Sequence, residues 1–129
     1  MTIAHASRPV TAIIEEIADV TRQGKASPPW GTLSRRGRKY GVQFYAVTQR
    51  PAEIDKTAYG QCSRVWSGRM FGEGDQKRAA ALTGVRIDAI KALRVPWYFY
   101  RDEHGNVTRE RIHFGKGHKA KRSRLSERI

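Results

Sequence analysis

The first apolar segment of the chain is a short β-branched run with two acids directly after it. Residues 10–14 read Val-Thr-Ala-Ile-Ile, and Glu15 and Glu16 follow. A nearly continuous apolar run of this length is typical of a strand that is buried in a parallel sheet. The pattern therefore predicts a first strand over 10–14, with two carboxylates at its C-terminal end.

A loop, a short helix and a second strand are predicted next. Residues 21–31 are rich in Pro, Gly, Ser and Lys, which indicates a loop. A helix is expected to begin at Ser27 or Pro28 and to end at Tyr40, because proline suits a first turn and a glycine follows. Residues 42–48 read VQFYAVT, a β-branched and aromatic run that stops at a Gln-Arg-Pro segment, and they are predicted to form the second strand.

The rest of the chain alternates short helical and strand-like runs. The pattern predicts a helix over 52–61, a strand over 64–71, helices over 75–83 and 88–93, and strands over 97–101 and 107–114. A turn-rich Asp-Glu-His-Gly-Asn spacer separates the last two runs, which favours an antiparallel β-hairpin. The expected fold class is therefore α/β, with flanking helices and a C-terminal hairpin.

The length of the chain predicts how many domains it has, and its net charge predicts the type of partner. The chain has 129 residues, with 25 Lys and Arg against 12 Asp and Glu and a formal net charge of +13 at pH 7. This length predicts a single modest domain, which we place at 1–114. Residues 115–129 are almost free of apolar side chains and rich in Lys and Arg, so they are expected to form a basic, disordered tail. A polyanion is the first expected partner.

Several classes of protein are excluded by composition. No window approaches the roughly 20 apolar residues that a membrane-spanning helix needs, and residues 1–7 lack the apolar region of a secretory leader. The single cysteine, Cys62, cannot form an intramolecular disulfide, and with four scattered His it offers no zinc-ligand spacing. A cytoplasmic chain without a membrane span is expected.

Polar side chains follow both predicted strands of the first half. Glu15 and Glu16 come after the first strand, and Gln49 comes after the second. The carboxyl ends of parallel strands meet at one edge of a sheet, where open α/β sheets bind their ligands. Acids at that edge can hold a hydrated Mg²⁺ and polarise a water, and an amide can orient that water or contact a terminal phosphate. These are the requirements of nucleotide hydrolysis.

Two segments together resemble a known superfamily. AIIEEIADVT, followed by GTLSRRGRKYGVQFYAVTQRPAEIDKTAYGQCSRV, is similar to the second half of a HerA/FtsK-type P-loop ATPase. The resemblance covers roughly 10–114, and its densest part is RRGRKYG, VTQRP and QC. It implies a partial RecA-like sheet and a DNA-translocating motor that uses ATP and Mg²⁺, acting in phage DNA packaging or DNA transfer. A phage-encoded chain in a bacterial host would fit this group.

The resemblance also implies roles for individual residues. It makes residues 13–16 the Walker B segment, with Glu15 near Mg²⁺ and Glu16 as the carboxylate that activates water, although most members have Asp where this chain has Glu15. It makes Gln49 the sensor glutamine. Because such motors bind ATP between protomers, Arg64 or Arg69 could act in trans on a neighbouring subunit's nucleotide.

One part of the ATPase pattern is missing from the sequence. No G-x-x-x-x-G-K-[ST] motif occurs in the 129 residues, so the β- and γ-phosphates would have no cradle of backbone amides and no lysine. We therefore expect the chain alone to hydrolyse ATP poorly. A truncated or split motor, or a start codon assigned too late, is the simplest interpretation. Oligomerisation, or a partner chain that supplies the phosphate loop, is expected to complete the site.

Two basic clusters are candidates for contact with DNA phosphates, although either could be no more than a solvated surface. They comprise Arg35, Arg36, Arg38 and Lys39 in the first half, and Lys116, Lys119, Lys121, Arg122 and Arg124 in the tail. An alternative function is a non-catalytic DNA-binding protein on a degenerate ATPase scaffold. A third possibility is a nucleic-acid chaperone built around the tail.

Overall fold

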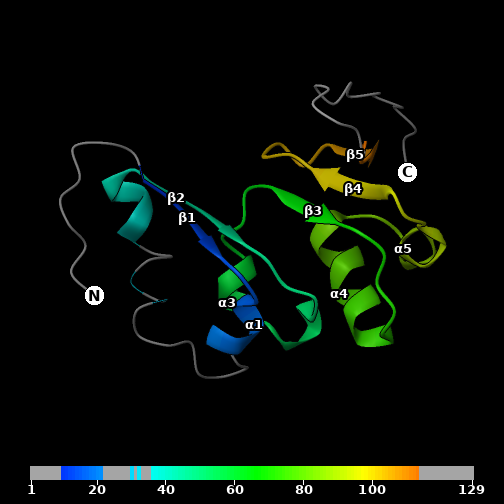
Figure 1. The fold of residues 1–129 in the computed structure, drawn as a ribbon, viewed down its shortest axis with the longest axis horizontal. Coiled ribbons are helices and arrows are strands. Elements are labelled where there is room, and N and C mark those ends of the chain that lie inside the picture. The colour runs from blue at the N-terminus through cyan, green and yellow to red at the C-terminus, as the bar shows by residue number, and fades with distance from the viewer. Residues whose placement is uncertain (1–9, 22–29, 31, 33–35, 114–129) are drawn as a thin grey trace. The chain divides into compact units, whose positions relative to one another are not determined.

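The protein was analysed as a computed structural model that describes residues 10–21, 30, 32 and 36–113 (Figure 1). The chain divides into two compact units, unit 1 (Met1–Gln61) and unit 2 (Cys62–Ile129). The single domain predicted over 1–114 stays a prediction. The predicted tail, 115–129, lies outside the described residues.

Unit 1 is built on a parallel pair of strands. Its elements are β1 (Val10–Ile14), α1 (Ile17–Val20), η1 (Gly37–Tyr40), β2 (Val42–Ala46), η2 (Pro51–Glu53) and α3 (Lys56–Tyr59). The register of β1 and β2 runs from Val10 opposite Val42 to Ile14 opposite Ala46. Both strands lie where the sequence predicts them, although β2 ends two residues earlier than expected. The parallel pairing brings the C-terminal ends of the two strands to the same edge.

One face of this strand pair carries the core of unit 1. The buried residues are Ile17 and Ala18 of α1, Trp30 from the segment before η1, Ile54 directly after η2, and Ala58 of α3. Phe44 of β2 packs against this cluster, with its ring edge-to-face to that of Trp30 at 5.3 Å between centroids. On the opposite face Ile13 is 68% exposed, and Tyr45 and Val47 are also exposed. Within the described residues, unit 1 therefore covers only one face of its sheet.

The helices of unit 1 differ from the sequence prediction. The predicted helix over 52–61 is wrong as one element, because Ile54 adopts an extended conformation (φ −73°, ψ 138°) between η2 and α3. This break places the Ile54 side chain in the core, while the amide of Asp55 donates to the carbonyl of Thr21 at 3.1 Å. Helix α1 has only four residues and was not predicted, since so short a segment shows no period.

The helix expected up to Tyr40 is described only in part. Trp30, Thr32 and Arg36 are helical, and the 3₁₀ helix η1 ends at Tyr40. Gly41 follows with a positive φ of 70°, as a helix stop requires.

Unit 2 is an antiparallel sheet with two helices. It contains β3 (Val65–Ser67), α4 (Glu73–Thr83), α5 (Ile87–Ala92), β4 (Trp97–Arg101) and β5 (Val107–Arg111), with strand order β3-β4-β5 (Figure 1). β4 and β5 pair antiparallel from Trp97 opposite Arg111 to Arg101 opposite Val107. A buried cluster joins the sheet to the helices and consists of Ala79, Val85, Ile90, Leu93 and Phe99. Unit 2 thus has a core of its own.

Element boundaries in unit 2 also depart from the prediction. β5 ends at Arg111, whereas a strand up to residue 114 was expected. β3 is limited to 65–67, whereas a strand over 64–71 was expected. Helix α4 begins at Glu73 after Gly72, two residues before the predicted start at 75, so Asp75 lies in its first turn. An acid there still interacts favourably with the N-terminal end of the helix dipole. The predicted end of this helix at residue 83 is confirmed, and Gly84 follows in a left-handed conformation (φ 78°).

Across the part of the chain that the structure describes, no helix is both long enough and apolar enough to cross a membrane.

Candidate functional site

The candidate site lies in unit 1, where β1 ends and the chain turns into α1. Glu16 occupies this turn with φ 47° and ψ 64°, and it is the one described residue other than glycine with a positive φ. A side-chain-bearing residue in the left-handed region costs about 1 kcal/mol or more, and such residues cluster at functional sites. The conformation is fixed on both sides, because the amide of Ile17 donates to the carbonyl of Val47 (2.9 Å) and that of Asp19 to the carbonyl of Glu16 (3.0 Å).

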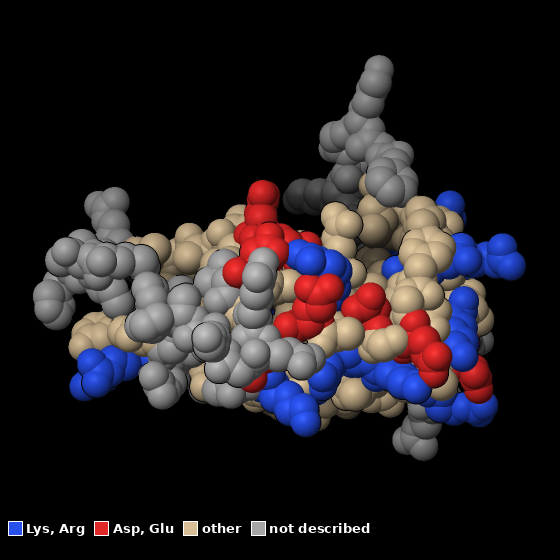
Figure 2. Space-filling view, turned by 90° about the horizontal axis from the view of Figure 1, so that it is seen from below, with Lys and Arg blue, Asp and Glu red and all other residues tan. Residues whose placement is uncertain are grey.

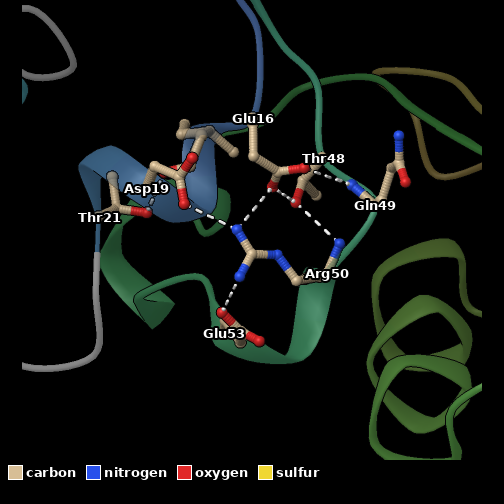
Figure 3. A network of polar contacts seen from close by, with 8 residues as sticks. Glu16, Asp19, Thr21, Thr48, Gln49, Arg50 and Glu53 are labelled. Atoms are coloured by element: carbon tan, nitrogen blue, oxygen red, sulfur yellow. Dashed lines mark hydrogen bonds and ion pairs between the residues drawn. The ribbon is translucent and has the colours of Figure 1, made fainter.

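The carboxylate of Glu16 is held by the segment that follows β2 (Figure 3). The hydroxyl of Thr48 donates to Glu16 Oε1 at 2.6 Å, and the backbone N–H of Gln49 donates to Glu16 Oε2 at 3.3 Å. The hydrogen bond from Thr48 is the largest cause and lowers the pKa of Glu16. Desolvation comes second and raises this pKa, the Gln49 N–H and the charge of Arg50 lower it further, and the charge of Asp19 raises it. Glu16 is therefore an ionised carboxylate at neutral pH.

Arg50 lies among three carboxylates from three different elements (Figure 3). Its guanidinium donates from Nη2 to Asp19 at 2.7 Å and from Nη1 to Glu53 at 3.0 Å, and Nη2 lies 4.0 Å from Glu16 Oε1. The hydrogen bond to Asp19 is the first cause that raises the pKa of Arg50. We call the group of Glu16, Asp19, Thr48, the Gln49 amide, Arg50 and Glu53 the carboxylate centre.

Glu16 and Gln49, both predicted for this edge, lie close together, but not in the way the prediction implies. The contact uses the backbone N–H of Gln49, while its side-chain amide extends away from the carboxylate (Figure 3). The Gln49 residue is exposed, so its amide can reach a ligand in solvent. Glu15 is exposed in the bend just before Glu16.

An exposed acid suits Mg²⁺, which usually keeps several waters and is bound through one or two carboxylates plus substrate phosphates. Among the described residues, no group of three or more His, Cys, Asp or Glu side chains is placed to hold a metal ion. The chemistry of Glu15 therefore fits a hydrated ion shared with a phosphate, and it does not fit a dedicated protein cage.

The two arginines predicted to act in trans both lie in unit 2, with contacts of their own. Arg64 makes a bidentate pair with Glu103, from Nε at 2.8 Å and from Nη2 at 3.0 Å, and this pairing lowers the pKa of Glu103. The guanidinium of Arg69 lies 4.8 Å from the ring centroid of Phe71, which is itself 81% exposed. Arg69 is exposed and forms no ion pair with an acid among the described residues of unit 2.

Only part of the predicted DNA-contacting surface is described. Arg36 and Lys39 are exposed. The side chain of Arg38 is not described, and the remaining candidates lie outside the described residues: Arg35, Lys116, Lys119, Lys121, Arg122 and Arg124. Figure 2 shows Asp and Glu side chains interspersed with Lys and Arg on the face it views. Ion pairs within unit 2 include Lys77 with Glu73 (2.6 Å) and Arg86 with Asp88 (3.3 Å).

Sequence reasoning missed four members of the carboxylate centre. Thr48 and Arg50 are the sequence neighbours of Gln49, so the argument that placed Gln49 at the sheet edge also applied to them. Asp19 and Glu53 gave no signal, because each is a single acid in a short element that periodicity does not reveal.

Comparison with known sequences gives two partial matches. No protein-family model matches the chain. The chain is 59% identical over 68 residues to Protein P9 of Pseudoalteromonas phage PM2, a match that covers 53% of this chain and 31% of P9. It is 32% identical over 91 residues to the probable helicase MJ1565 of Methanocaldococcus jannaschii, covering 67% of this chain and 18% of the helicase. The chain therefore spans less than a third of the length of these curated relatives.

Comparison with solved structures identifies the fold. B204, the DNA-packaging ATPase from Sulfolobus turreted icosahedral virus, superposes with a TM-score of 0.68 at 17% identity, over 80% of this chain and 52% of B204. The chain shares the fold of the P-loop packaging ATPases. A second packaging-ATPase structure, B204 of Sulfolobus turreted icosahedral virus 2 in complex with ATP-gammaS, matches with a TM-score of 0.63 at 16% identity, over 77% of this chain and 50% of that protein. The predicted resemblance to packaging P-loop ATPases is thus confirmed at the level of the fold.

Proposed function

We propose that the chain supplies the hydrolytic half of an ATP-driven DNA-packaging or DNA-translocating motor. The observation that carries the proposal is the ionised carboxylate of Glu16, held at the end of β1 by the segment after β2. In an open α/β sheet this edge is where ligands bind. The packaging-ATPase fold and the 59% identity to a phage protein over 68 residues support a phage-encoded motor acting in the cytoplasm of a bacterial host.

Hydrolysis needs a base, a group that orients the water and an electrostatic partner for the phosphates. In this proposal Glu16 accepts a proton from the attacking water, which requires the ionised form that its contacts favour. The exposed amide of Gln49 orients that water or contacts the terminal phosphate. Glu15 holds a hydrated Mg²⁺, which when bound neutralises charge on the phosphates. Arg64 or Arg69 approaches the nucleotide of a neighbouring protomer.

In this proposal another polypeptide supplies the phosphate-binding loop, because the 129 residues contain no G-x-x-x-x-G-K-[ST] motif. We infer that a partner chain supplies the phosphate loop; another copy in a homo-oligomer would add an arginine in trans but not this loop, because every copy lacks it. The exposed face of unit 1 supports this inference, since Ile13, Tyr45 and Val47 leave apolar surface open on a two-stranded parallel sheet. Parallel sheets are normally covered on both faces, and two strands alone have marginal stability.

A non-catalytic DNA-binding protein remains the second candidate, because the net charge of +13 favours a polyanion whether or not ATP is used. Nucleotide affinity separates the two functions. Tight binding of magnesium-ATP by the purified chain contradicts the non-catalytic alternative.

The decisive experiment is Glu16→Gln in an assembly where a phosphate-loop polypeptide completes the chain. We expect nucleotide binding to be retained and turnover to fall by about 10²–10⁴-fold, the usual contribution of a general base. Glu73→Gln is the matched control, since Glu73 is an exposed acid of α4 that pairs with Lys77. Turnover of Glu16→Gln at the wild-type rate would refute the assignment.

A further inference from the structure

The guanidinium of Arg50 joins two segments of unit 1 that are far apart in the sequence, residues 16–19 and residues 50–53. It contacts Asp19 in α1 and Glu53 in η2, and it lies 4.0 Å from Glu16 at the end of β1. Three carboxylates and one guanidinium leave this cluster with an excess of negative charge. Without Arg50, the carboxylates would repel one another and the orientation of Glu16 would lose one of its constraints.

The hydroxyl of Thr48 is held in one orientation by two neighbours. Its oxygen accepts the backbone N–H of Arg50 at 3.0 Å, and its proton is donated to Glu16 Oε1 at 2.6 Å. A hydroxyl has a single proton, and a backbone N–H can only donate, so the proton of Thr48 is directed toward the carboxylate. The backbone of Arg50 therefore fixes the hydroxyl, while its side chain fixes the surrounding acids.

We propose that Thr48 and Arg50 are positioning residues that hold the carboxylate of Glu16 in a single orientation at the strand edge. This inference rests on the proposed function, in which Glu16 is the base. Thr48 acts on Oε1 directly. Arg50 acts through Thr48 and through the acids of α1 and η2.

The geometry requires an arginine and does not suit a lysine. Nη1 and Nη2 reach different acids, Glu53 and Asp19, from one planar group. A lysine would offer a point charge that cannot span the same set of oxygens.

The exposure of the Arg50 side chain distinguishes a role in positioning Glu16 from a role in the global stability of the fold. The Arg50 side chain is 43% exposed, and ion pairs in such surroundings contribute little to the free energy of unfolding. Loss of Arg50 should therefore disturb the local arrangement around Glu16 while it leaves global stability nearly unchanged. A merely structural role predicts the reverse.

The test uses the full chain and measures hydrogen exchange at the backbone N–H of Gln49, which donates to Glu16 Oε2. We expect Thr48→Val to speed this exchange by about tenfold, the equivalent of losing one charge-assisted hydrogen bond. Arg50→Gln should speed it by a smaller factor, because the guanidinium lies 4.0 Å from Glu16 and acts on it without a hydrogen bond. Thr48→Ser should restore the wild-type rate because it keeps the hydroxyl, and Arg50→Lys should restore it only in part. Arg86→Gln is the control, since Arg86 is an exposed arginine of unit 2 with an acidic partner.

A second readout is the kinetics of the completed assembly. Thr48→Val should lower kcat and leave KM unchanged, because nucleotide is still bound while the base is misaligned. Unchanged Gln49 exchange in both Thr48→Val and Arg50→Gln would overturn the inference. The exchange measurement needs no nucleotide, so its failure is distinct from that of the proposed function, which fails if Glu16→Gln turns over ATP normally.

Discussion

Units 1 and 2 differ in how completely the faces of their sheets are buried, and in how far apart in the sequence the partners of their carboxylates lie. Unit 2 closes a core between an antiparallel sheet and two helices that are adjacent in the chain, with Ile90 fully buried. Unit 1 pairs two parallel strands separated by a long segment and, within its described residues, leaves one face of them exposed. Unit 2 therefore encloses a core of its own, whereas unit 1, within its described residues, leaves apolar side chains on one face of its strand pair exposed.

The same contrast holds for their carboxylates. Asp102 of unit 2 accepts hydrogen bonds from the amide of His104 and from the backbone and side chain of Asn106, all within its own turn. Glu16 of unit 1 accepts from Thr48 and Gln49, more than thirty residues away. Asp102 therefore stabilises a local turn, while Glu16 depends on the tertiary alignment of two strand ends.

The largest expected effect tests the difference in burial. Ile90→Ala should lower the free energy of unfolding by about 2–5 kcal/mol, because it leaves a cavity in the closed core of unit 2. Ile13→Ala, at a position 68% exposed in unit 1, should cost about 1 kcal/mol or less in the isolated chain. Urea unfolding of both variants measures this. Equal losses would mean that the exposed face of unit 1 is already covered in solution.

A smaller effect tests the difference between the carboxylates. The contacts with Asn106 and His104 lower the pKa of Asp102 in the folded state, chiefly through the side chain of Asn106. A lowered pKa gives a stabilising contribution that is present above the ordinary aspartate pKa and is lost as pH falls toward the folded value. Asp102→Ala should thus lower the melting temperature slightly at pH 7, and the difference from wild type should vanish in acid.

The control for this prediction is Asp88→Ala, an exposed acid of the same unit. In the completed assembly Asp102→Ala should leave ATP turnover unchanged, in contrast to Glu16→Gln. A melting-temperature difference that persists in acid, or a loss of turnover, would contradict the purely structural role of Asp102.

The sequence predicted the edge of the sheet better than it predicted the contacts there. The apolar runs predicted β1 and β2. The rule that the carboxyl ends of parallel strands meet at one edge then predicted that Glu16 and Gln49 lie near each other. The left-handed turn at Glu16 and the contact of its carboxylate with the backbone N–H of Gln49 depend on tertiary hydrogen bonds, which periodicity cannot reveal. The break at Ile54 was missed for a similar reason, because burial of one side chain overrides the helical propensity of its neighbours.

ATP turnover on mixing tests the central claim most directly. The chain and a phosphate-loop polypeptide would be assayed separately and together, in the presence of Mg²⁺ and DNA. We predict negligible ATP turnover by either component alone and clear turnover when they are combined. The loop that binds the phosphates and the carboxylate that activates water are then present in one site. Equal turnover by the phosphate-loop polypeptide with and without this chain would contradict the account.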